Sequence, residues 1–161
     1  MSYSFRKTDP SLTLGLRRIA QEEIAAALAE IDDTSLDHVS TVHQLRKRCK
    51  KLRGLVRLVR PGFAPYAEEN AAFRDLARDL SALRDAGAMI ETVTALEERF
   101  GDVIGADFFG KVREMLTTAH PPAEDRLVRA RLRAARKAFA DALERVETWD
   151  VRGKPHKVLS K

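Results

Sequence analysis

A stripe of basic side chains runs along the segment between Val42 and Arg60. Its members follow steps of three and four residues, which places them on one side of a helix; they are His43, Arg46, Lys50, Arg53, Arg57 and Arg60, with Lys47 beside them. From His43 to Arg57 the stripe extends about 21 Å at ~1.5 Å rise per residue. Because guanidinium and ammonium groups bind phosphate oxygens, the stripe predicts a track for a linear polyanion.

The segment contains no charge of the opposite sign. Eight Lys or Arg residues occur from Arg46 to Arg60, and no Asp or Glu lies between His38 and Ala67. Unpaired like charges three or four positions apart cost a helix a few tenths of a kcal/mol per pair, so an ordinary solvated face mixes signs. The alternative is that the stripe is merely solvated or is neutralised by carboxylates of neighbouring helices, for which the candidates are Asp75, Asp79 and Asp85.

A second basic run lies near the end of the chain. Arg126, Arg129, Arg133 and Arg136 again step by three and four, with Lys137 adjacent, and an apolar set lies beside them: Val128, Leu132, Phe139 and Leu143. If the two helices pack as neighbours, Arg129, Arg133 and Lys137 would form a second wall of the same groove. Glu124, Asp125 and Asp141 bracket this run, which favours a solvated face more strongly than in the first stripe.

Catalytic and metal-binding patterns are missing from the sequence. Cys49 lies six residues after His43, about 240° around a helix, so the two cannot share a metal from one face. No Glu-x-x-His, Cys-x-x-Cys, phosphate-binding loop or Gly-x-Ser-x-Gly pattern occurs, and the basic stripe has no nearby carboxylates to place Mg²⁺. We therefore expect no metal, no cofactor and no enzymatic activity, and we expect Cys49 to be a packed thiol.

The surrounding sequence favours an all-α fold. Apolar residues recur at helical spacing over four long segments, about 11–31, 36–60, 64–100 and 123–149, and over a short one at 107–118. Asp85-Ala86-Gly87 interrupts the third segment and is expected to bend it. Short links between such segments predict an up-and-down bundle of four long amphipathic helices plus one short helix. We expect residues 1–10 to be a leader, 11–149 the bundle and 150–161 a flexible basic tail.

Composition limits the partners. The 161 residues carry a net charge of +5, and aromatic residues are only 6% of the chain, which leaves few platforms for stacking nucleic-acid bases. Nucleic acid and an acidic protein partner nevertheless remain alternative ligands for the basic stripe. No signal-like or membrane-spanning apolar stretch occurs, so we expect a cytoplasmic protein without membrane contact.

Two motifs resemble a known family. The run Val42-His43-Gln44-Leu45-Arg46-Lys47-Arg48-Cys49-Lys50-Lys51-Leu52-Arg53 resembles the signature of the CHAD family, the conserved-histidine α-helical domains. The run Leu80-Ser81-Ala82-Leu83-Arg84-Asp85-Ala86 is similar to that family's Leu-x-x-Leu-Arg-Asp segment. The resemblance extends over roughly residues 11–148 and corresponds to the N-terminal half of a full-length domain.

The resemblance implies a ligand and a set of contacts. The family is associated with inorganic polyphosphate and with targeting to polyphosphate granules, and its fold pairs two helical bundles around a basic channel. By that resemblance His43, Arg46, Lys50 and Arg53 are the first candidates for phosphate contacts, and Arg84 joins them through the second motif. Family members are usually about twice as long, so a homodimer that restores the second half-domain is an expected partner arrangement.

Overall fold

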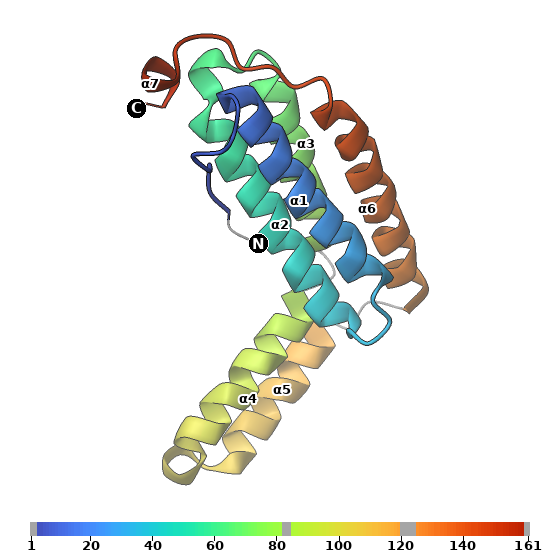
Figure 1. Ribbon diagram of the computed structural model, residues 1–161. Coiled ribbons are helices and arrows are strands. Elements are labelled where there is room, and N and C mark those ends of the chain that lie inside the picture. Colours follow the sequence, from blue (N-terminus) through green and yellow to red (C-terminus); the bar gives the residue numbers. More distant parts are fainter. Residues whose placement is uncertain (1–2, 82–84, 120–124, 160–161) are drawn as a thin grey trace.

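The computed structural model describes residues 3–81, 85–119 and 125–159, and its regular elements are helices (Figure 1). In chain order they are α1 (Leu12–Asp32), α2 (His38–Leu58), the 3-10 turn η1 (Arg60–Gly62), α3 (Tyr66–Ser81), α4 (Asp85–Ile104), α5 (Ala106–Ala119), α6 (Asp125–Val146) and α7 (Pro155–Val158). The predicted all-α bundle is confirmed. Among the described helices, none has a stretch long and apolar enough to cross a membrane.

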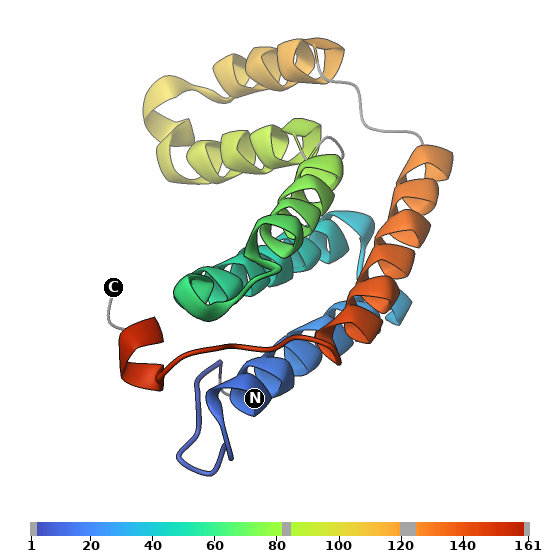
Figure 2. The ribbon, with the colours of Figure 1, turned by 90° about the horizontal axis from the view of Figure 1, so that it is seen from above.

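Four helices form the bundle. α2 packs against α1 on one side and α3 on the other, while α6 packs mainly against α1 and less extensively against α3. The order around the bundle is therefore α1, α2, α3, α6, and α2 lies diagonally across from α6 (Figure 2). The core contains an apolar seam along α2 and its C-cap, spaced by three and four residues: Leu45, Cys49, Leu52, Val56 and Val59, each 0% exposed.

The ends of α2 are set by local chemistry. Asp37 precedes the helix, and its carboxylate accepts a hydrogen bond from the Ser40 amide at 2.8 Å, which satisfies one of the unpaired donors of the first turn. At the other end Pro61 and Gly62 lie in the η1 turn, where the chain reverses toward α3. The basic stripe is therefore carried on a regular helix of 21 residues.

The predicted third helix is two helices. α3 ends at Ser81, whose hydroxyl donates to the carbonyl of Ala77 at 2.8 Å, a side-chain bond that competes with the helical pattern. α4 begins at Asp85 and runs in a different direction, out of the bundle, with α5 beside it (Figure 1). The apolar period continues across the break, which is why the sequence favoured a single bent helix.

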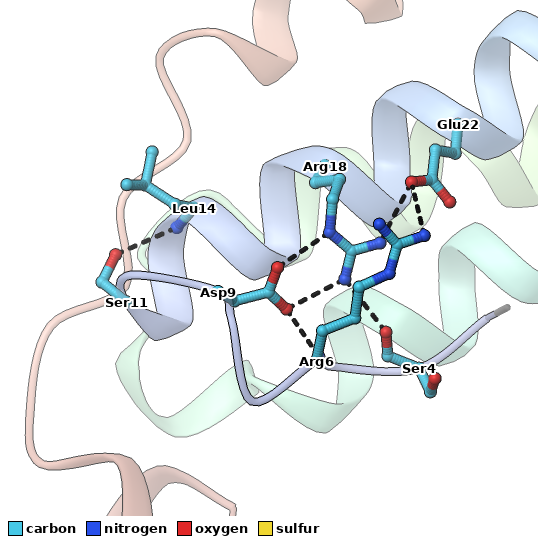
Figure 3. Close-up of polar contacts among 7 residues, drawn as sticks. All are labelled: Ser4, Arg6, Asp9, Ser11, Leu14, Arg18 and Glu22. Atoms are coloured by element: carbon cyan, nitrogen blue, oxygen red, sulfur yellow. Dashed lines mark hydrogen bonds and ion pairs between the residues drawn. The ribbon is translucent and has the colours of Figure 1, made fainter.

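Residues 3–10, predicted as a leader, lie along α1 (Figure 3). Arg18 donates to Asp9 at 2.8 Å and to the carbonyl of Ser4 at 3.0 Å, and Ser11 caps α1 by accepting from the Leu14 amide. The hydrogen bonds from Arg18 and from the Arg6 amide lower the pKa of Asp9 to about 2, so this carboxylate is charged at neutral pH. The N-terminal segment thus has defined contacts with the bundle.

The segment after α6, for which we predicted a flexible tail, returns across the end of the bundle. The Arg152 amide donates to the carbonyl of Gly62 at 2.8 Å, and Val158 of α7 is buried. A Cβ atom at position 62 would lie 2.2 Å from the Arg152 carbonyl oxygen, closer than any real side chain approaches. This close approach therefore requires glycine at position 62.

Replacing Gly62 with alanine tests whether this packing holds in solution. The added methyl group must displace the 151–158 segment, so we expect the free energy of unfolding to fall by about 1–3 kcal/mol in thermal or urea denaturation. Gly110→Ala is the control, because nothing lies within 4 Å of a Cβ there and alanine favours a helix interior. Equal stability of Gly62→Ala and wild type would contradict the observed contact.

Candidate anion-binding site

The basic stripe of α2 lines a groove of about 550 Å³. The residues around it are His43, Arg46, Lys47, Lys50 and Arg53 of α2 and Ala77 of α3. His43, Lys47 and Lys50 are exposed, whereas Arg46 and Arg53 are half-buried. The part of the predicted stripe from His43 to Arg53 therefore lies together on one concave surface, about 15 Å long at ~1.5 Å per residue.

The α2 cations in this groove are not neutralised by α3. Within the described part of the chain, Arg46, Lys47 and Lys50 have no ion-pair partner, and the Arg53 Nε donates to the amide oxygen of Asn70 at 3.2 Å. α3 thus opposes the stripe with a neutral amide and with the methyl group of Ala77. Among the described lining residues, α2 supplies the positive charges and α3 supplies no carboxylate.

The carboxylates that might have neutralised the stripe pair elsewhere. Asp75 accepts from Arg74 at 2.9 Å, and this hydrogen bond, with a minor contribution from the charge of Arg53, lowers the pKa of Asp75. Asp79 lies 3.8 Å from Arg131 of α6. Asp85, the third candidate, lies outside the described side chains. Asp75 and Asp79 therefore form their ion pairs outside the stripe, and Asp75 keeps only a minor Coulombic interaction with Arg53.

On its other side, α2 is neutralised. Arg48 donates to Glu23 at 2.8 Å and to Glu30 at 2.6 Å, and Lys51 donates to the second oxygen of Glu23 at 2.8 Å. Both carboxylates belong to α1, and Glu23 is buried. The eight Lys and Arg residues of the segment therefore include two that hold α2 against α1 and four that line the groove facing α3.

Burial would raise the pKa of Glu23, but hydrogen bonds from Lys51 and Arg48 outweigh it and hold the pKa below the ordinary value. Tyr3 covers this cluster, donating its hydroxyl to the Lys51 carbonyl, and its ring lies 5.3 Å from the Lys51 ammonium. Burial raises the pKa of Tyr3 to about 12, so it stays a neutral donor. The cluster is a satisfied structural contact between α1 and α2.

Two features that define the groove were not predicted from the sequence: the pairing of Arg48 and Lys51 with the α1 carboxylates, and the hydrogen bond from Arg53 to Asn70. Glu23 and Glu30 are seven residues apart, which places them on one face of α1 as a match for Arg48 and Lys51, and this spacing was the available signal. Nothing in the sequence singled out Asn70, because a single amide in an otherwise ordinary helix carries no pattern.

Cys49 is part of the core. Its thiol is 0% exposed, and burial raises its pKa to about 12, so it remains protonated at neutral pH. Within the described ranges no three His, Cys, Asp or Glu side chains come close enough to hold a metal ion.

Comparison with known protein families identifies the family of the chain. Residues 18–160 match the family model of the CHAD domain. The chain belongs to the CHAD domain family. This family is associated with polyphosphate binding. No match was found among curated proteins or among solved structures.

Four other predicted site residues of this CHAD domain, Arg57, Arg129, Arg133 and Lys137, lie away from the described groove lining. Arg57 is exposed on α2, beyond the last lining residue. Arg84 lies outside the described residues. Arg129, Arg133 and Lys137 are exposed on α6, and the Lys137 ammonium pairs with Asp141 at 2.7 Å.

The structure places the second wall of the groove on α3 rather than α6. Because α6 lies diagonally across the bundle from α2, the bundle core separates the two basic runs. Our expectation that the last helix would face α2 across one groove is therefore wrong for this bundle. The physical reason is that α3 and α1 occupy the two positions next to α2, which leaves α6 the diagonal one.

Replacing Glu23 with glutamine tests the contact that holds α2 in place. A carboxylate whose folded-state pKa is depressed stabilises the fold above its unfolded pKa and loses that contribution as pH falls through the folded value. We expect Glu23→Gln to lower the free energy of unfolding by about 2 kcal/mol at neutral pH, with the two proteins converging in acid. Urea denaturation at several pH values measures this. Asp141→Asn is the control, because its pair with Lys137 is exposed and should contribute little.

Proposed function

We propose that this CHAD domain binds inorganic polyphosphate along the α2–α3 groove without turning it over. The observation that supports this most directly is the concave row of Arg46, Lys47, Lys50 and Arg53, which no carboxylate of the described residues neutralises. Family membership favours polyphosphate over other polyanions. A linear chain of phosphates with a negative charge at each unit matches a linear row of cations.

Each groove residue would contribute differently. The Arg53 guanidinium donates one hydrogen bond to Asn70, which fixes its plane and leaves its remaining donors for phosphate oxygens. Arg46 is half-buried and offers a planar fork, whereas exposed Lys47 and Lys50 act as mobile point charges. His43 at the end of the row can donate one hydrogen bond when neutral and adds a charge when protonated.

Longer chains would extend past the groove. Arg57 continues the row along α2, and we propose from the family motif that Arg84 adds a further phosphate contact. Arg129, Arg133 and Lys137 form a separate basic run on α6, so we propose that they contribute only to chains long enough to pass around the bundle. A domain of this kind would associate with polyphosphate granules in the cell.

Nucleic acid and an acidic protein surface are the competing ligands. Among the described residues that line the groove, the imidazole of His43 is the only aromatic ring. Single-stranded nucleic acids rely on base stacking for much of their affinity, so this lining favours a ligand that consists of phosphate alone.

Removing two groove cations should weaken binding. We expect Arg46→Ala/Lys50→Ala to raise the dissociation constant for long-chain polyphosphate about 10- to 100-fold, since charge-assisted hydrogen bonds contribute about 1.5–3 kcal/mol before solvent screening. By analogy with single-stranded polyanions, the slope of log affinity against log salt should flatten by about 1.4 for two lost contacts. Isothermal titration calorimetry at several salt concentrations measures both quantities.

The matched control is Arg152→Ala/Lys154→Ala, which removes the same charge from exposed positions near the η1 end of the bundle. The control should bind like wild type if the groove is the site. Equal weakening in both variants would mean that polyphosphate responds only to net charge, and unchanged affinity in the groove variant would place the site elsewhere.

Chain length should govern affinity. Pyrophosphate can contact only part of the row, so we expect its affinity to be at least tenfold lower than that of size-fractionated polyphosphate long enough to contact all four cations. A competition titration against single-stranded DNA and RNA at fixed ionic strength should favour polyphosphate. Equal affinity for pyrophosphate would rule out a linear track, and preferential binding of a nucleic acid would replace the proposed ligand.

A further inference from the structure

The α4–α5 hairpin has a small core of its own. Its two helices are joined by the single residue Gly105, whose φ of 92° favours glycine and allows the tight reversal. Figure 2 shows the pair side by side and outside the four-helix bundle. Among the described side chains of the hairpin, only Val93 and Phe109 are buried, and neither belongs to the main core cluster.

The same hairpin exposes most of its large apolar side chains. They are Leu96, Phe100, Val103 and Ile104 of α4 and Phe108 and Met115 of α5. Val103 is 85% exposed and Met115 is 65% exposed. Single exposed apolar residues are ordinary on protein surfaces, but a concentration of this kind marks an interaction site.

Helical geometry places an apolar stripe of α4 and an apolar stripe of α5 on one face of the hairpin. At ~100° per residue, Leu96, Phe100 and Val103 lie about 20–80° to one side of the inward-facing Val93, whereas Ile104 lies about 20° to the other side. Phe108 and Met115 of α5 lie about 100–120° from Phe109 in the same rotational sense. Because α4 and α5 run antiparallel, an equal rotational sense puts the two stripes on the same side of the hairpin.

An ion pair marks the opposite side. Glu97 and Arg113 each lie about 40° from the inward direction in the other rotational sense, and their side chains are paired across the two helices. The exposed Glu98, Asp102 and Glu114 lie farther around the same polar side. The hairpin is therefore amphipathic as a unit, with one polar face and one apolar face that Arg99 borders, its guanidinium lying 5.5 Å from the centre of the Phe100 ring.

From this face we infer that two copies of the chain pair through their α4–α5 hairpins to form an intermolecular four-helix bundle. If a large side chain offers about 150–200 Å², the exposed fractions of Leu96, Phe100, Val103, Phe108 and Met115 correspond to about 500 Å² per protomer. Two such faces bury about 1,000 Å², the minimum for a biological interface and the size of a weak, concentration-dependent one. A two-fold axis brings the same face against itself, so both apolar faces are covered at once.

The inference does not depend on the proposed ligand. The groove on α2 and α3 belongs to the bundle, whereas the pairing face belongs to the projecting hairpin. Oligomeric state and polyphosphate affinity can therefore fail independently of one another.

The test measures the mass of the full chain in solution. Light scattering and sedimentation equilibrium from micromolar to millimolar concentration should give twice the 18.1 kDa of the monomer at the upper end. Val103→Glu/Met115→Glu should raise the dimer dissociation constant at least tenfold, with unchanged far-ultraviolet circular dichroism and polyphosphate affinity. Both positions are largely exposed, so the substitutions should not disturb folding of the monomer.

The matched control adds the same charges away from the apolar face. Ala95→Glu/Thr118→Glu lies at exposed positions about 160–180° from the α4–α5 contact and should leave the dimer intact. Amide hydrogen exchange should slow with protein concentration in 92–119 and stay constant in α1 and α2. A monomer at every concentration, or a dimer indifferent to the Val103/Met115 variant, would overturn the inference.

Discussion

The charge of Glu23 determines what the rest of α2 can do. This buried carboxylate accepts from Arg48 and Lys51, and with Glu30 it neutralises the side of the helix that faces α1. A helix so rich in cations could not pack into a bundle with both sides unpaired, because each buried charge without a partner costs several kcal/mol. Pairing on the α1 side allows α2 to be a core helix while its other side keeps its charge.

The α3 wall of the groove contributes no carboxylate among its described lining residues. α3 presents Asn70 and Ala77 to the groove, and its acidic residue Asp75 is paired with Arg74 instead. An amide at position 70 orients Arg53 without cancelling its charge, which a carboxylate at the same place would do. The small side chain of Ala77 leaves room for a ligand between the helices. The groove is thus defined as much by neutral residues as by basic ones.

Sequence periodicity could predict α2 almost completely, since the spacing of three and four fixes both its buried seam and its exposed stripe. The periodicity could not predict which helix lies across the groove from α2, because short connections allow several arrangements of helices around a bundle. The position of α6 across the diagonal follows from packing among α1, α3 and α6, which no local pattern encodes. The division into α3 and α4 was predicted only as a bend at Asp85-Ala86-Gly87, because the apolar period continues through the change of direction.

Burial of the apolar seam of α2 stabilises the helix by more than the repulsion within its basic stripe destabilises it. Four like-charged pairs at spacings of three or four occur among Arg46, Lys47, Lys50, Arg53 and Arg57, costing roughly 1–2 kcal/mol in all. Each of the five buried residues in the seam contributes about 1.5–3 kcal/mol or somewhat less for Cys49. Burial therefore exceeds the repulsion several-fold, and the helix folds with its charges exposed. A bound polyanion would remove that repulsion, so the same charges that weaken the empty protein would stabilise the occupied one.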